Sequence, residues 1–124
     1  MSDFGLYASI YEQLRVYADR LDYALVNLRN KDIDTVAKAR KELVSLLRNS
    51  SGANTSQSTG TLIAMVLSHE LKRNRDELST LFISLADVFE KNKQSEDDIA
   101  KLESIAAAID KECANTGKRM RGMA

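Results

Sequence analysis

Apolar residues recur at alternating intervals of three and four along most of this chain, and no other feature of the sequence constrains the fold as strongly. From Tyr7 to Leu28 the repeat continues without a break. This spacing places the apolar side chains on one face of an α-helix, like the a and d positions of a helical bundle. Proline, which would interrupt such helices, is absent, and glycine occurs only five times. The sequence therefore predicts an all-α protein.

Interruptions of the repeat divide the chain into four predicted helices, of which the second is short and the third is long. Asp34 or Asp32 can cap the second helix, and Ser95 with an acid at Asp98 can cap the fourth. Gly117 is the expected end of the fourth helix, and Asn74 interrupts the apolar face of the third. The predicted helices span about residues 3–29, 33–48, 59–92 and 95–117, and the third helix begins near Thr59 or Thr61.

These four helices predict an antiparallel four-helix bundle, and a three-helix core with an attached hairpin is the alternative. Ile33 is expected to begin the apolar face of the short second helix. The core is expected to centre on Leu14, Leu21, Leu71, Leu78, Leu85, Leu102 and Ile109.

The 124 residues have the length of one domain, which we assign to residues 1–124. Small polar residues dominate residues 50–60, which predicts a flexible loop, and residues 118–124 are expected to form a basic tail. Eighteen basic residues balance eighteen acidic ones, which argues against a nucleic-acid partner. The longest apolar run, Leu62–Leu67, is too short to span a membrane. A single cysteine and a start without signal-peptide character favour a reducing, cytoplasmic setting.

The first and third predicted helices carry more apolar residues than one neighbouring helix requires. We expect this surplus to bind a partner protein or a second copy of the chain, because large apolar surfaces mark interaction sites. The residues predicted to bind the partner are Tyr11, Tyr23, Leu62, Val66, Phe82 and Phe89. The sequence therefore predicts a non-catalytic helical interaction module that acts as an adaptor, as a chaperone-like protein or by self-association.

Residues that carry catalysis or bind metals are few. One histidine and one cysteine lie on different predicted helices, and no acid lies on the apolar faces, so we expect no metal site. Cys113 falls on the apolar face of the fourth helix and is predicted to pack as a small apolar residue. No glycine-rich phosphate-binding loop is present, and we expect no cofactor. These observations favour a protein that is not an enzyme.

The single histidine of the chain lies in the segment Ser68–Lys72, which has the sequence SHELK. It resembles the H-box in the dimerisation helices of sensor histidine kinases, and more loosely the phosphoacceptor segment of histidine phosphotransfer domains. That resemblance implies that His69 accepts a phosphoryl group, that Glu70 orients or deprotonates the ring, and that Lys72 lies near the phosphoryl group. The heptad places His69 on the exposed face of its helix. The alternative function is therefore phosphate relay through His69.

Overall fold

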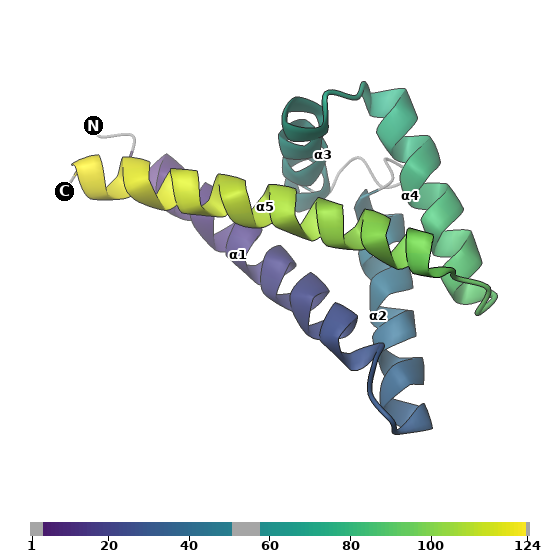
Figure 1. Ribbon diagram of the computed structural model, residues 1–124. Coiled ribbons are helices and arrows are strands. Elements are labelled where there is room, and N and C mark those ends of the chain that lie inside the picture. Colours follow the sequence, from purple (N-terminus) through teal and green to yellow (C-terminus); the bar gives the residue numbers. More distant parts are fainter. Residues whose placement is uncertain (1–3, 51–57, 124) are drawn as a thin grey trace.

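The computed structural model describes residues 4–50 and 58–123, and within these ranges the chain folds into five helices without a strand (Figure 1). The all-α prediction is confirmed. The four-helix bundle is not confirmed, because the region expected to form one long third helix forms two. The helices are α1 (Phe4–Asn27), α2 (Ile33–Ser50), α3 (Ser58–Leu71), α4 (Arg75–Glu90) and α5 (Glu96–Met123).

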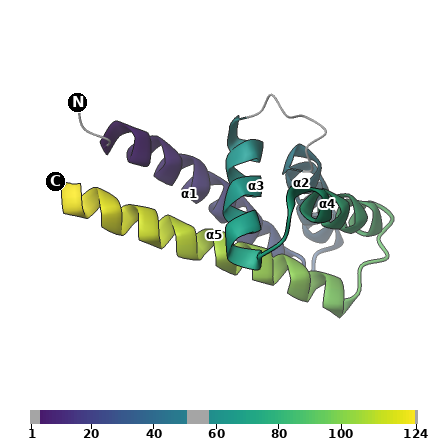
Figure 2. The ribbon, with the colours of Figure 1, turned by 90° about the horizontal axis from the view of Figure 1, so that it is seen from above.

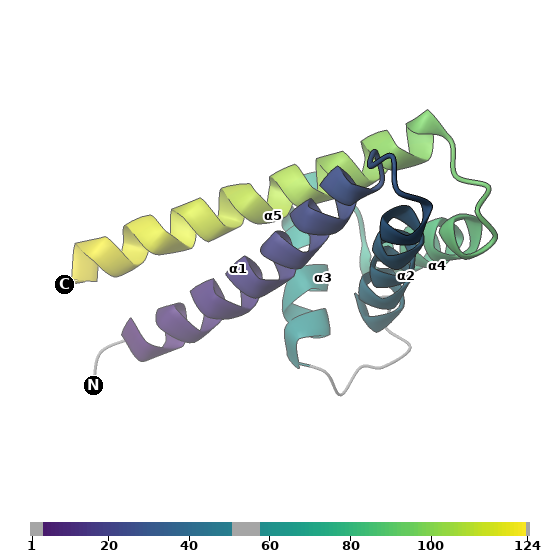
Figure 3. The ribbon, with the colours of Figure 1, turned by 90° about the horizontal axis from the view of Figure 1, so that it is seen from below.

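The helices form two antiparallel pairs that α3 connects. α1 and α5 lie side by side with the two chain ends at the same end of the pair, and α2 lies beside α4 (Figures 1 and 2). α3 crosses the α1–α5 pair and contacts each of the other four helices (Figure 3). The parts of α1 and α5 nearest the chain ends extend past α3 (Figure 2). One side of α3 therefore faces the projecting parts of α1 and α5.

Apolar side chains hold α1 against α5. Each helix places them at spacings of three and four, which line up on its inner face. The buried residues of α1 are Leu14, Tyr17, Ala18, Leu21 and Ala24, and the buried apolar residues of α5 are Leu102, Ile105, Ala106, Ala108, Ile109 and Cys113. The expected core is confirmed except at Leu71, which is half-buried at the end of α3.

α5 does not end at Gly117, which corrects a prediction made from the sequence. The helix continues to Met123, so the expected basic tail from Lys118 onward forms its last turns. A side-chain carbon at Gly117 would lie only 3.3 Å from Cε2 of Tyr11 on α1. The glycine therefore lets two helices approach closely, and it does not act as a C-terminal cap.

Phe82 and Phe89 of α4 are fully buried and belong to the core. The prediction that they bind a partner is wrong. α4 buries residues 78, 82, 85, 86 and 89, so its inner face is rotated by about one residue from the predicted one, and Leu81 and Val88 are only half-buried. At the edge of the α2–α4 contact, Arg48 forms ion pairs with Asp87, over 3.1 Å, and with Glu90.

A turn separates α3 from α4, where one continuous helix was predicted. Lys72 adopts a left-handed conformation with φ of 54°, and the amide of Arg73 donates to the carbonyl oxygen of Ser68 over 3.3 Å. These features end α3 in a Schellman motif. The Asn74 side chain then accepts a hydrogen bond from the Glu77 amide over 2.8 Å, and the Glu77 carboxylate accepts one from the Asn74 amide. The long helix is interrupted because this capping box starts a new helix.

Other local predictions have mixed outcomes. Ser95 caps α5 through reciprocal hydrogen bonds with Asp98, as predicted. Of the two candidate caps of α2, Asp32 is the one that accepts a hydrogen bond from the Thr35 amide. Ile33 is 82% exposed and does not join the core, because the start of α2 extends beyond α4 (Figure 1). Residues 51–57 of the predicted flexible loop lie outside the described residues, and its edges belong to α2 and α3.

Phe82 offers a test of the α4 packing. We expect Phe82→Ala to lower the free energy of unfolding by about 3–5 kcal/mol, because the substitution removes a buried ring and leaves a cavity. Ile83→Ala is the matched control, since Ile83 is 44% exposed, and we expect it to cost less than about 1 kcal/mol. Urea denaturation followed by circular dichroism measures both values, and equal losses would contradict the observed face of α4.

Candidate functional site

An apolar groove lies where α3 crosses the projecting part of the α1–α5 pair. We call it the three-helix groove. Its volume is about 220 Å³, and apolar side chains form most of its wall. It is lined by Tyr7 and Ile10 of α1, by Leu62, Met65, Val66 and His69 of α3, and by Glu112, Thr116 and Arg119 of α5.

α3 supplies most of the apolar wall. Its groove-lining residues are spaced by three and four, so they share one face of the helix. A different face carries Ile63, Ala64 and Leu67, which are buried in the core. Met65, on the groove face, is 64% exposed. α3 is therefore apolar on two faces, and one of them reaches solvent.

The α1 wall of the groove is uncharged. Tyr7 and Ile10 line the groove, and Leu6, which precedes Ile10 by four residues, lies on the same side of α1. Leu6 is 62% exposed, and residues 4–11 contain no charged side chain. The apolar surface of the groove thus continues along the projecting end of α1.

The α5 wall, in contrast, carries ion pairs. Arg119 pairs with Glu112 over 3.6 Å, and Lys111 pairs with Glu70 of α3 over 3.2 Å. The two acidic side chains are largely covered, with exposures of 12% for Glu70 and 20% for Glu112, whereas Lys111 and Arg119 are 66% and 55% exposed. The charge that reaches solvent on this wall is therefore mainly positive.

Two of the predicted partner-binding residues, Leu62 and Val66, lie together in the groove. Tyr11 instead packs against Gly117 between α1 and α5. Tyr23 is 74% exposed and lines a separate hollow of about 420 Å³ between α1 and α2. The six predicted partner-binding residues therefore lie in four places: the groove, the contact between α1 and α5, the hollow between α1 and α2, and the core.

His69 is exposed, as the heptad predicted, and lines one end of the groove in the last turn of α3. The other two residues of the predicted relay site are placed less favourably for it. The carboxylate of Glu70 is engaged by Lys111 of α5, and Lys72 lies exposed in the turn that follows α3. The structure thus offers an accessible imidazole, but the neighbouring acid has another partner.

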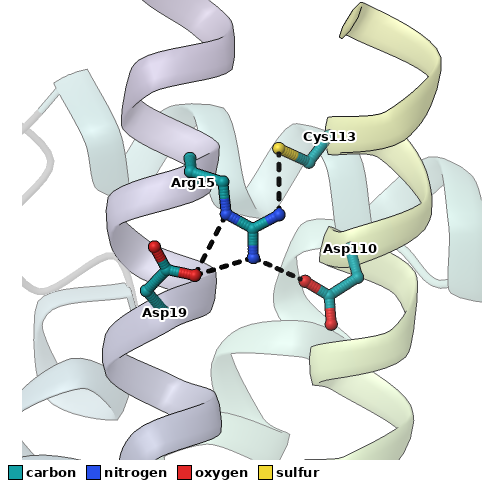
Figure 4. Close-up of polar contacts among 4 residues, drawn as sticks. All are labelled: Arg15, Asp19, Asp110 and Cys113. Atoms are coloured by element: carbon teal, nitrogen blue, oxygen red, sulfur yellow. Dashed lines mark hydrogen bonds and ion pairs between the residues drawn. The ribbon is translucent and has the colours of Figure 1, made fainter.

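A polar cluster around Arg15 lies between α1 and α5 (Figure 4). The Arg15 guanidinium donates hydrogen bonds to Asp19 over 2.8 and 3.0 Å, to Asp110 over 3.3 Å and to Sγ of Cys113 over 3.8 Å. The hydrogen bond to Asp19 raises the pKa of Arg15, which stays charged. Sequence reasoning missed this cluster, and only the spacing of four between Arg15 and Asp19 signalled part of it.

Burial controls the acid–base behaviour of the groups beside Arg15. It raises the pKa of the Cys113 thiol, which is 1% exposed and packs in the core as predicted. A protonated thiol is a poor nucleophile. Burial also raises the pKa of Asp22, and the nearby Asp110 carboxylate raises it further. The cluster therefore holds charges in place and offers no activated nucleophile.

The described residues contain no group of three or more histidine, cysteine, aspartate or glutamate side chains that could hold a metal ion. None of the helices in these ranges is both long and apolar enough to cross a bilayer. Comparisons with protein-family models, with curated proteins and with solved structures find no match to this chain. The groove and the charges around it are therefore the features that indicate its function.

The raised pKa of Asp22 predicts a pH-dependent effect on stability. In the unfolded chain Asp22 has an ordinary pKa of about 3.9, and in the folded chain its pKa is higher. Between these two pKa values the folded state binds more protons than the unfolded state. The free energy of unfolding therefore falls as the pH rises through this interval. At neutral pH Asp22 is ionised, and the whole destabilising effect of its burial is present. We expect Asp22→Asn to raise the melting temperature at pH 7.

The same gain should shrink as the pH falls below about 4, where Asp22 is protonated in both states. Differential scanning calorimetry at several pH values measures it. Asp19→Asn is the control, because it removes a hydrogen-bonding partner of Arg15 and should not stabilise the protein at pH 7. If Asp22→Asn raised the melting temperature by the same amount at every pH, the raised pKa of Asp22 in the folded state would be contradicted.

Proposed function

We propose that this chain is a non-catalytic helical interaction module that binds a helix of a partner in the three-helix groove. The observation that carries the proposal is the second apolar face of α3, which is only partly covered: Met65 is exposed, and Leu62 and Val66 are half-buried. A helix that is apolar on more than one face is normally buried on all of them. Here the core covers Ile63 and Leu67, while the face that carries Leu62, Met65 and Val66 lines an open groove.

The size of the groove supports a protein partner. Pockets for small molecules and cofactors usually enclose about 300–1,000 Å³, whereas this groove has a volume of about 220 Å³. Such a space suits one or two bulky side chains that anchor a larger partner. Amphipathic helices bind in this way, with apolar residues spaced by three and four seated in a groove between helices.

The orientation of α3 supports a helical occupant in particular. α3 lies across the α1–α5 pair, and the pair projects beyond it on the groove side (Figure 2). A partner helix placed beside α3 would rest on the uncharged wall formed by Tyr7 and Ile10, and Leu6 would extend this contact. The partner would thus pack on α1, α3 and α5.

Met65 provides the test, because it is exposed in the free protein and central to the groove face. Helical peptides that bind the full chain are selected from a displayed library of amphipathic sequences. We expect Met65→Glu to weaken their binding at least about tenfold, since a carboxylate would be buried against apolar side chains. Fluorescence anisotropy measures the affinities, and circular dichroism checks that each variant is folded.

Ile83→Glu is the matched control, because Ile83 is a partly exposed apolar residue on α4 and does not line the groove. It should leave peptide binding unchanged. If no peptide binds, or if both substitutions weaken binding equally, the groove is not a docking site.

Phosphate relay through His69 is the second candidate, and the exposure of its ring favours it. In this proposal the imidazole accepts a phosphoryl group from an aspartyl phosphate of a receiver, and the chain needs no nucleotide of its own. Positioning and charge neutralisation are the main demands of such a transfer. Lys72 and Arg73, in the turn after α3, are the nearest cations along the chain.

The relay predicts that the protein becomes labelled by a phosphorylated receiver or by acetyl phosphate. His69→Gln should abolish the label and leave the melting temperature unchanged, because His69 is exposed and contributes little to packing. Phosphate-affinity electrophoresis detects the label. An unlabelled wild-type protein, under conditions that label a known relay protein, would contradict this candidate.

A further inference from the structure

The charges beside the three-helix groove are unequally distributed between its two long walls. On α1, residues 4–11 carry no charge. On α5, Lys111 and Lys118 are seven residues apart and lie on one flank of the helix, and Arg119 lines the groove next to them. Lys118 is exposed, and no ion pair joins it to another described residue.

The acids near this wall do not neutralise it at the surface. Glu70 and Glu112 are each paired and mostly covered, so the cationic ends of Lys111 and Arg119 are what a partner would meet. Within the described part of α5, no acid follows Glu112, whereas Lys118, Arg119 and Arg121 do. A partner therefore meets an apolar floor, a neutral edge at α1 and a positive edge at α5.

We infer that the partner is an acidic amphipathic helix whose carboxylates lie along the edge of its apolar face that is next to α5. The inference rests on the proposed function and specifies its partner. Complementary charges at the rim of an interface select the partner and speed association. Apolar residues of the helix would fill the groove, and its acids would meet Lys118 and Arg119.

A second copy of this chain fits the groove less well. A symmetric contact brings the same surface of both copies together, so the interface would hold the α5 cations of both copies. Glu70 and Glu112 are already paired and mostly covered, so neither copy offers free carboxylates to those cations. Like charges placed opposite each other oppose association. A different protein that supplies acids removes this conflict.

The experiment compares two peptides with the same apolar face, taken from the groove-binding selection described above, with either glutamates or lysines along one edge. We expect the glutamate peptide to bind the full chain at least about tenfold more tightly at low salt, and the preference to narrow at high salt. The double variant Lys118→Glu/Arg119→Glu should reverse the preference. Lys118→Glu alone should reduce it, and this variant leaves the Arg119–Glu112 pair intact.

Lys91→Glu/Lys93→Glu is the matched control. It changes the net charge by the same amount at exposed positions after α4, at the end of the molecule away from the groove (Figure 1). We expect it to keep the preference for the glutamate peptide. If the control abolishes the preference as the groove variant does, net charge and not the α5 edge is responsible, and the inference is overturned.

The remaining outcomes separate this inference from the proposed function. Equal binding of the two peptides, or tighter binding of the lysine peptide, overturns the acidic partner while groove docking stands. Binding that is insensitive to Met65→Glu overturns both. Binding of the chain to vesicles containing phosphatidylserine, lost on Met65→Glu, would replace the protein partner with an anionic lipid surface. Self-association lost on Met65→Glu would replace it with a second copy.

Discussion

The turn between α3 and α4 determines how the other helices pack. The left-handed Lys72 ends one helix, and the capping box of Asn74 and Glu77 begins the next. If the helix continued, α3 and α4 would share one axis, and α3 could not cross the α1–α5 pair while α4 runs beside α2. Because the chain turns here, α4 buries Phe82 and Phe89 against the core. The same turn leaves α3 with a second apolar face that the described helices cover only in part.

Much of the fold could be predicted from the sequence, because the apolar repeat is strong where a helix has one main neighbour. The inner faces of α1 and α5 follow it closely, and the cap at Ser95 was recognisable. The repeat was less informative for α4, whose buried face depends on where α2 and α3 lie. The pair Asn74 and Glu77 also indicated the turn, but the apolar repeat resumes in the same register after Asn74 and so favoured one continuous helix. The predicted end of α5 at Gly117 was wrong because this glycine allows a close contact with Tyr11 and does not end the helix.

The candidate site was predictable only in part. Leu62 and Val66 stood out as surplus apolar residues, and they do line the groove. By the same criterion Phe82 and Phe89 belonged with them, yet they are core residues, because composition cannot distinguish an apolar face awaiting a partner from one covered within the chain. The other walls come from α1 and α5, which are distant in sequence from α3. Only the tertiary structure brings Ile10, Thr116 and Arg119 together.

The contact between α1 and α2 has an optical consequence. All four tyrosines of the chain lie on α1, and tryptophan is absent, so the tyrosine absorption and emission of the protein report on one helix. Oη of Tyr17 lies 2.9 Å from Oγ of Ser50 on α2, and burial raises the pKa of Tyr17 to about 12. Its phenol therefore remains protonated in moderately alkaline solution while α1 stays packed against α2. The ionisation of this one ring thus marks the separation of the two helices without any added label.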